Sequence, residues 1–227
     1  MTGYVKLVRV DGTELDIVNS ARLSYNKQST TLSDADRNLI RFLVRENHTS
    51  PFRHVHLSLE FKAPLIVARQ HWRHIVGAST LEDGTPFSEL SRRYVRDDEE
   101  YYMPTTWRTA PANSKQGSGK DITDAETIAL INELYSDFIE YGDNLYHRLM
   151  DLGVAPEQAR LALPAYALYT KYLWTPSLHA AMNFVDLRRA SDAQAEIREY
   201  SDVVEDMIKD NFPTVYEAWL EHRVLES

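Results

Sequence analysis

The segment His54-Val55-His56-Leu57-Ser58-Leu59-Glu60-Phe61-Lys62 decides the fold, because apolar and polar residues alternate along its whole length. Successive side chains of a β-strand point to opposite faces. The pattern therefore predicts a strand over 54–62 that has one buried face and one exposed face. The rest of the chain has to supply the layers that cover the buried face.

Two further strands are expected from residues that favour extended structure. The stretch from Tyr4 to Val10 is rich in β-branched residues and ends at Asp11-Gly12, which predicts a strand followed by a hairpin turn. Residues Leu168 to Trp174 predict another strand. The sequence thus supplies partners for the strand at 54–62.

Apolar residues at helical spacing occupy most of the remaining chain. Ser33 and Asp36 form a capping box before a helix that ends near Asn47, and Thr123 and Glu126 form another before a long helix that ends near Gly153. Helices are also expected over 65–74, from Pro156 to the residue before Pro164, over 178–187, after the capping pair Ser191 and Gln194, and over 214–224.

Strands and helices in this order predict an α+β fold with helices packed on a mostly antiparallel sheet. The length of 227 residues suits one compact domain, 1–227. Between Thr109 and Ile122 the chain is rich in Pro, Asn, Ser, Gly and Lys, which cannot form a core. We expect 109–122 to be a mobile loop inside that domain.

Composition excludes several classes of protein. A net charge of −9 and a pI near 5.4 exclude a broad basic surface for nucleic acid. The absence of cysteine removes disulfides, thiolate metal sites and cysteine nucleophiles. No apolar run reaches membrane-spanning length, and Met1 to Gly12 lacks the layout of a signal peptide. We therefore expect a cytoplasmic protein that binds neither membranes nor nucleic acids.

Arginine is concentrated in two short segments, Arg69-Gln70-His71-Trp72-Arg73-His74 and Ser88-Glu89-Leu90-Ser91-Arg92-Arg93-Tyr94. A helix through the first segment would stack Arg69 over Arg73. Guanidinium groups make paired, charge-assisted hydrogen bonds to phosphate oxygens without losing their charge. By spacing alone, a solvated helix face followed by a basic loop explains the same residues. The segments are candidates for an anion site, and that simpler interpretation stays open.

Other familiar sites have no support in the sequence. No glycine-rich nucleotide loop follows a strand. His54 and His56 share a strand face, and His71 and His74 share a helix face, but neither pair has carboxylate or thiolate partners at a metal-binding spacing. We expect no metal site.

Taken in order, the polar segments resemble the flavin-dependent thymidylate synthases. In that family H-x-[ST]-P-F-x-H precedes K-A-P, then R-Q-x-x-R-H-R, then S-x-R-Y. The matching segments here are His48-Thr49-Ser50-Pro51-Phe52-Arg53-His54, Lys62-Ala63-Pro64, Arg69 to His74, and Glu89 to Tyr94. Gly153-Val154-Ala155-Pro156-Glu157-Gln158-Ala159-Arg160 and Ala193-Gln194-Ala195-Glu196-Ile197 continue the match, which extends from Ala21 to Tyr200.

The resemblance implies a homotetramer whose active sites are shared between subunits. It also implies reductive methylation of dUMP to dTMP, with methylenetetrahydrofolate as carbon donor and NADPH as reductant through FAD. The residues it assigns to dUMP are Gln70, Arg73, Glu89, Leu90, Ser91, Arg93, Arg160 and Arg188. Those it assigns to FAD are Ser24, His48, Ser50, Arg73, His74, Asn183 and Leu187.

Two of these residues are the candidates for catalysis. A fixed guanidinium at Arg188 can favour the ionised uracil N3, and the Ser91 hydroxyl can orient or polarise dUMP. Arg93 and Arg160 suit a dianionic phosphate. Considered singly, each arginine could instead pair with a nearby carboxylate, and Ser91 could cap a helix; the ordered set favours the functional assignment.

The chain departs from the family at two places beside these residues. Ile75 replaces the last arginine of R-Q-x-x-R-H-R, and Leu81-Glu82-Asp83-Gly84-Thr85-Pro86 is inserted before Ser91. These departures keep two alternatives open, a flavin-dependent dUMP hydroxymethylase and a nucleotide-binding homologue with weakened catalysis. A third, binding of single-stranded nucleic acid through Trp72, Tyr94, Tyr101 and Tyr102, is disfavoured by the acidic balance.

Overall fold

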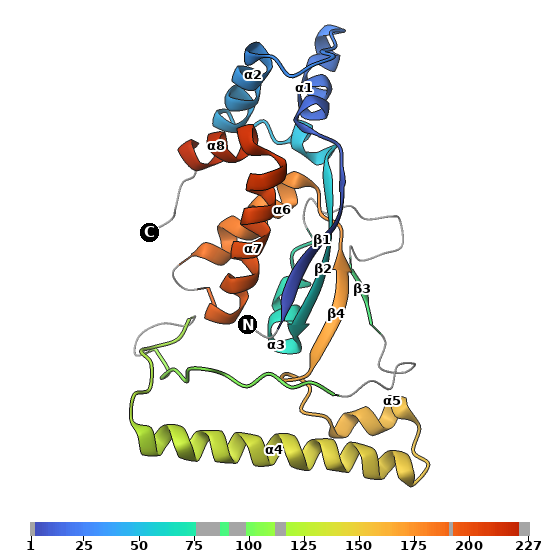
Figure 1. Cartoon of the computed structure of the whole chain (residues 1–227), viewed down its shortest axis with the longest axis vertical. Helices are drawn as coiled ribbons and strands as arrows, with labels where there is room; N and C mark the ends of the chain where they lie inside the picture. The colour runs from blue at the N-terminus through green and yellow to red at the C-terminus, as the bar shows by residue number, and fades with distance from the viewer. Residues whose placement is uncertain (1–2, 76–86, 91–98, 112–116, 191–192, 223–227) are drawn as a thin grey trace.

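The computed structural model describes residues 3–75, 87–90, 99–111, 117–190 and 193–222 (Figure 1). Its strands are β1 (Tyr4–Asp11), β2 (His56–Pro64), β3 (Phe87–Glu89) and β4 (Tyr169–Trp174). The α-helices are α1 (Glu14–Arg22), α2 (Asp34–Arg45), α3 (Leu65–His71), α4 (Ala125–Asp151), α5 (Pro156–Ala159), α6 (Leu178–Arg189), α7 (Ala195–Asn211) and α8 (Pro213–His222). Three 3₁₀ turns are η1 (Leu23–Tyr25), η2 (Ser50–Arg53) and η3 (Arg160–Ala162).

The four strands form one sheet in the order β1-β2-β4-β3, and every neighbouring pair is antiparallel. Strand β2 is central, and its Leu59 pairs with Leu7 of β1 on one side and with Trp174 of β4 on the other. The expected α+β architecture with an antiparallel sheet is confirmed.

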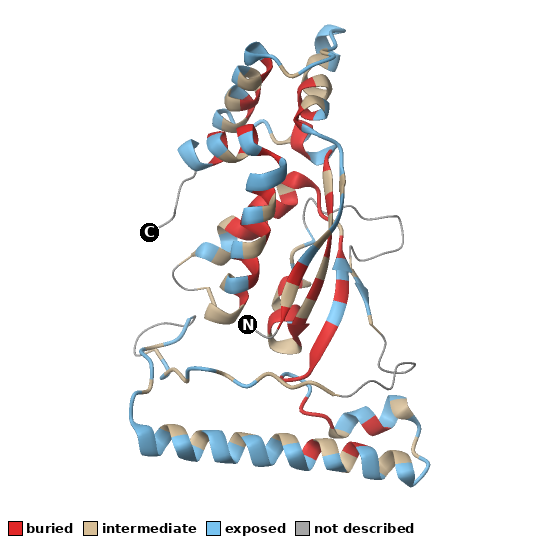
Figure 2. Cartoon of the chain, in the orientation of Figure 1, coloured by how far each residue is buried: buried red, intermediate tan, exposed pale blue. Residues whose placement is uncertain are grey.

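The core lies against one face of β2. Leu57, Leu59 and Phe61 have no exposed surface, as the alternation predicts. Helices α3 and α6 contact β2, and α7 contacts β1, so these helices cover the apolar face (Figures 1 and 2). Because burying a large apolar side chain contributes roughly 1.5–3 kcal/mol, this layer is a main source of stability.

The expected hairpin after β1 is wrong, because the chain enters α1 directly. Gly12 has a φ of 91°, which redirects the backbone, and a side chain there would contact Val55. Thr13 then forms a capping box with Asp16, whose Oδ2 accepts from the Thr13 amide at 2.7 Å. The chain does turn at Asp11-Gly12, but the capping box that follows starts a helix instead of a second strand.

Helix α4 extends away from the main core and lies across one end of the molecule (Figure 1). It begins after Asp124, whose side chain accepts from the Thr127 amide, so the cap is one residue later than the expected Thr123. Leu134 and Phe138, from its expected apolar side, are 61% and 56% exposed. Most of the helix is exposed in the single chain (Figure 2).

A second, smaller core holds the C-terminal half of α4. Tyr146 packs there with Ala159, Leu163 and Leu168. A Cβ added to Gly142 would lie 2.8 Å from the Ala162 carbonyl oxygen and 2.8 Å from Pro164 Cδ. Glycine at 142 therefore allows the close approach between α4 and the segment that follows α5.

Residues near both ends of the expected mobile loop pair with each other. The Thr109 amide donates to Lys120 O at 2.9 Å, and the Ile122 amide donates to Trp107 O at 2.8 Å. Residues 112–116 lie outside the described part, and the mobility of 109–122 stays a prediction. Within the described ranges, no helix combines the length and apolarity needed to cross a membrane.

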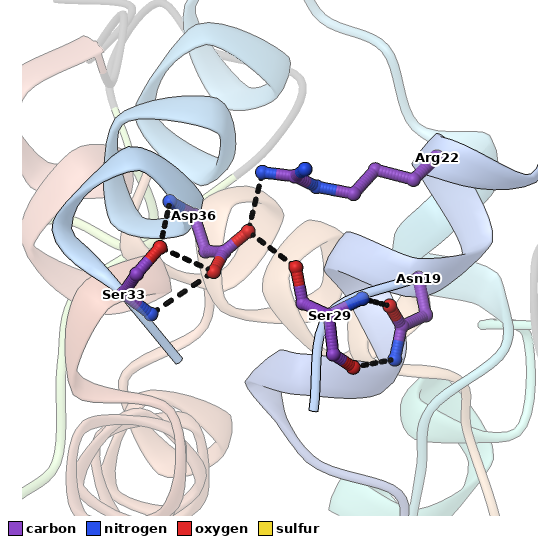
Figure 3. Close-up of polar contacts among 5 residues, drawn as sticks. All are labelled: Asn19, Arg22, Ser29, Ser33 and Asp36. Carbon is purple, nitrogen blue, oxygen red and sulfur yellow. Dashed lines mark hydrogen bonds and ion pairs between the residues drawn. The ribbon is translucent and has the colours of Figure 1, made fainter. Parts of the chain in front are cut away.

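A buried carboxylate joins α1 to α2. Asp36 is 1% exposed. Its Oδ2 accepts from the Ser33 amide at 2.9 Å and hydroxyl at 2.6 Å, and its Oδ1 accepts from Ser29 Oγ at 2.9 Å and Arg22 Nη2 at 2.5 Å (Figure 3). The bonds from Ser33, with smaller contributions from Ser29 and Arg22, lower the pKa of Asp36 to about 2.

We expect Asp36→Asn to lower the free energy of unfolding at pH 7 by about 1–3 kcal/mol, because buried donors lose a charged acceptor. The folded pKa of about 2 lies below the ordinary 3.8, so the stabilisation is present above pH 4 and is lost as the pH falls toward 2. Urea unfolding at several pH values measures it. The stabilities of wild type and variant should converge at low pH, and Asp34→Asn, at an exposed position of the same turn, is the control. A difference in the free energy of unfolding that stays constant down to pH 2 would contradict the lowered pKa of Asp36.

Candidate active site

A pocket lies between the end of α3 and one face of α6. It consists of two adjoining cavities of about 500 and 420 Å³, both lined by Gln70, Leu187 and Arg188. The second is also lined by Arg73, His74 and Asn183. The structure thus brings together, in one chain, these residues that the resemblance assigns to dUMP and FAD.

The local backbone explains how these side chains meet. Strand β2 runs straight into α3, which ends at His71 rather than continuing to 74. The Arg73 and His74 amides then close a turn on the Gln70 and His71 carbonyl oxygens at 3.2 and 2.8 Å. The expected stacking of Arg69 over Arg73 along a helix is therefore wrong.

Helix α6 supplies the opposite wall. Its N-terminus is capped by Ser177, whose Oγ accepts from the Ala180 amide at 3.2 Å. Asn183 and Leu187, four residues apart, lie on the same helix face, with Arg188 beside them.

Buried aromatic side chains pack around His71, the last residue of α3. His71 is 1% exposed and lies between the rings of Phe61, Trp174 and Phe184. Its Nδ1 lies 2.9 Å from the Tyr172 hydroxyl. Burial, with smaller effects of His74 and Arg188, lowers the pKa of His71 well below its ordinary value. His71 is a neutral structural residue that fixes the end of α3.

His74 is one of the neutral polar groups of the pocket, together with Gln70 and Asn183. Burial, and secondly the nearby Arg188, lowers its pKa to about 4. Near pH 7 it can exchange hydrogen bonds without carrying charge, while Arg73 and Arg188 keep their positive charges. The pocket is therefore locally positive in a protein of net charge −9 and suits an anionic ligand.

Two further pocket residues were not assigned from the sequence. Gln194 accepts a hydrogen bond from Gln70 Nε2, and Arg108 pairs with Glu196. Burial is the largest single influence and raises the pKa of Glu196, but the hydrogen bonds from Arg108, the backbone and Gln194, together with the charge of Arg108, outweigh it and lower the pKa. Gln194 lies in a segment that matches the family, whereas Arg108 lies beside the loop and has no recognisable pattern. Arg108 and Gln194 also line an apolar cavity of about 440 Å³ next to the pocket.

The remaining expected site residues lie elsewhere. Glu89 and Leu90 are at the sheet edge, where Glu89 Oε1 accepts from Thr170 at 3.0 Å and the Leu90 amide donates to Lys171 O at 2.8 Å. Ser91 and Arg93 fall outside the described residues, as does the insertion 81–86.

Four other expected residues are also separate from the pocket. Ser24 is exposed in η1, and His48 and Ser50 follow α2, where Ser50 begins η2. Arg160 is exposed at the start of η3, next to α4. None of them lines the cavities between α3 and α6.

Comparison with known proteins agrees with this geometry. The family model described as thymidylate synthase complementing protein matches residues 6–214. Flavin-dependent thymidylate synthases from Thermus thermophilus and Kosmotoga olearia are each 37% identical, over 97% and 96% of this chain and 76% and 90% of their own lengths. The crystal structure of a UMP/dUMP methylase, PolB, from Streptomyces cacaoi bound with 5-Br UMP superposes with a TM-score of 0.81 at 26% identity, covering 97% of this chain and 94% of that one.

The α+β fold with an arginine-bearing pocket between α3 and α6 is that of a protein suited to bind a small anionic ligand. With the full-length matches added, the chain belongs to the thymidylate synthase complementing protein family. The resemblance inferred from the motifs is confirmed.

We expect Tyr172→Phe to lower the free energy of unfolding by about 1–3 kcal/mol, because His71 Nδ1 would lose its buried partner. Urea denaturation measures the change. Tyr146→Phe is the matched control, since Tyr146 is also buried and no described residue hydrogen-bonds its hydroxyl. Equal effects of the two substitutions would show that the His71 contact contributes nothing specific.

Proposed function

We propose that this protein is a transferase that methylates dUMP to dTMP, using FAD, methylenetetrahydrofolate and NADPH. The observation that carries the proposal is the pocket between α3 and α6, where Gln70, Arg73 and Arg188 face the same space as His74 and Asn183. The named relatives are flavin-dependent thymidylate synthases, and the solved relative is a UMP/dUMP methylase.

The pyrimidine side of the pocket is assigned to Gln70 and Arg188. Uracil C5 is a weak nucleophile, and this chain has no cysteine to activate it by addition at C6. The Arg188 guanidinium can instead stabilise negative charge on uracil N3, and Gln70, held by Gln194, can orient the ring. Arg188 is our proposed catalytic residue, and we assign to Ser91 the role of orienting dUMP.

The flavin side is assigned to Arg73, His74, Asn183 and Leu187. These side chains fit FAD. An uncharged imidazole and a carboxamide suit the polar edge of its isoalloxazine ring, and an arginine suits its pyrophosphate. Reduced FAD would supply the hydride that reduces the transferred methylene to a methyl group. Ile75, where the family has arginine, removes one cation from this side.

A single chain holds only part of this site, and we propose that a homotetramer completes it. Arg160 and the residues Ser24, His48 and Ser50 lie outside the pocket of their own chain. Helix α4 also exposes apolar side chains, Leu130, Leu134, Phe138 and Tyr141. Covering this face with other copies would bury it and bring Arg160 to the phosphate of a neighbouring site.

A cytoplasmic location belongs to the same proposal, because dUMP, reduced folate and NADPH are cytoplasmic metabolites. We also assign Arg93 to dUMP, together with Glu89 and Leu90 at the edge strand β3. Their support is the match of Glu89 to Tyr94 with the family motif.

We expect one NADPH to be oxidised for each dUMP converted, with a methyl group at C5 of the product. The methylene of the donor is at the oxidation level of formaldehyde and needs two electrons to become methyl. Anaerobic turnover, with NADPH loss and product mass followed together, measures both quantities, and UMP in place of dUMP tests the choice of sugar. A hydroxymethyl product without matching NADPH loss would establish the hydroxymethylase instead, and FAD and dUMP binding without turnover would establish the weakened homologue.

We expect Arg160→Ala and Arg188→Ala each to lower kcat/KM by at least about 10-fold, because each removes a charge-assisted contact. Co-expression of the two variants should restore about a quarter of the wild-type sites, if one copy supplies Arg160 and another supplies Arg188. Differently tagged chains, purified through both tags, measure the activity of mixed assemblies.

The matched control for this experiment is the pair Gln70→Ala and Arg188→Ala, because both residues line one pocket of one chain. That pair should restore no activity. Mixed Arg160→Ala and Arg188→Ala assemblies no more active than either variant alone would show that the site does not draw the two arginines from different copies.

A further inference from the structure

Three potential metal ligands, none of which lines the pocket between α3 and α6, lie close together. Glu99 precedes the segment that pairs with β4, and Asp143 and His147 lie one turn apart on α4. One donor atom from each of the three lies within 4.8 Å of the others. No metal site was expected from the sequence, where only His54 with His56 and His71 with His74 were considered; Glu99 is far from Asp143 and His147 along the chain.

A hydrogen bond restrains the Asp143 carboxylate, and burial restrains that of Glu99. Asp143 Oδ1 accepts from the Tyr101 hydroxyl at 2.8 Å, and Asp143 Oδ2 lies 3.6 Å from His147 Nδ1. Tyr101 is itself bridged to Leu168, next to β4. The Glu99 side chain is only 8% exposed. These carboxylates are therefore fixed by the fold.

The orientation of His147 leaves one ring nitrogen available as a ligand. Its Nδ1 lies 2.9 Å from the backbone oxygen of Asp143, and because that oxygen only accepts, Nδ1 carries the proton and donates. The lone pair of the neutral ring is then on Nε2, which lies 3.7 Å from Glu99 Oε2. A backbone carbonyl that fixes the imidazole in this way is the usual support of a metal-bound histidine.

The donor set selects a class of ion. One imidazole nitrogen with two carboxylate oxygens suits Zn²⁺ and similar transition-metal dications, whereas Mg²⁺ and Ca²⁺ favour oxygen alone. Bonds of about 2.0–2.2 Å require donors roughly 3.2–3.6 Å apart. His147 is 57% exposed, so its side chain has room for the small rotation that closes the site, and solvent can supply a fourth ligand.

We propose that Glu99, Asp143 and His147 form a Zn²⁺-binding site that clamps the segment at 99–102 onto α4. Tyr146, the neighbour of His147, anchors α4 in the second core, while the half of the helix before Gly142 lacks such a buried anchor among the described residues. An ion at this point would link α4 directly to the chain that pairs with Leu168 and Ala167.

The test uses the full chain, stripped with EDTA and dialysed, with ZnCl₂ as the only added probe. Equilibrium dialysis should give one Zn²⁺ per chain at this site, and the Tm should rise with Zn²⁺ concentration. His147→Gln and Asp143→Asn should each weaken binding at least about 10-fold. His222→Gln, at an exposed position near the end of α8, is the control and should bind like wild type.

Failure to bind Zn²⁺, or equal binding by wild type and both ligand variants, would overturn the proposal and leave an ion pair between His147 and its carboxylates. Binding of MgCl₂ or CaCl₂ with the same dependence on His147, in place of Zn²⁺, would overturn the assigned class of ion. His147→Gln changes an exposed side chain, so loss of binding with unchanged circular dichroism reports on the site and not on folding. The measurements need neither flavin nor dUMP, so their outcome is independent of the proposed methylation.

Discussion

The structure depends on the position of β2, whose one face is fully buried and whose two edges are both paired. Because a strand alternates with a period of two, a shift of one residue would expose Leu57, Leu59 and Phe61 together. The register of β1 and β4 is fixed by the same requirement. Since α3 follows β2 without a loop, the strand register also sets where Gln70, Arg73 and His74 meet α6.

Local signals in the sequence were sufficient where one interaction dominates. The alternation at 54–62 identified the buried face, and the Ser33 and Asp36 box identified the start of α2. The hairpin after Asp11 failed because a turn signal does not determine the type of the next element, and the Thr13 box favours a helix. Helix α3 ended earlier than its spacing implied, because His71 is committed to the buried Tyr172 and the chain turns there.

The candidate site could be predicted only through an ordered set of motifs. Arg73, Asn183 and Arg188 are far apart in sequence, and composition or spacing alone cannot bring them together. The family resemblance did so; in the structure the three residues line one cavity, and their assignment to dUMP and FAD stays a prediction. Arg108 and the cluster at Asp143 and His147 were missed, because both arise from contacts between distant segments that carry no motif of their own.

Gly142 marks the point about which α4 would tilt if its contact with the segment after α5 changed. The helix crosses the segment after α5 at this residue, and about 17 residues at 1.5 Å each place its N-terminus roughly 25 Å from the crossing. A methyl group added at Gly142 would push α4 away from the segment that follows α5. A tilt of about 6° at this point would move the N-terminus of α4 by about 2.5 Å. Small changes in volume at one crossing point are thereby amplified into larger displacements along the exposed surface of α4.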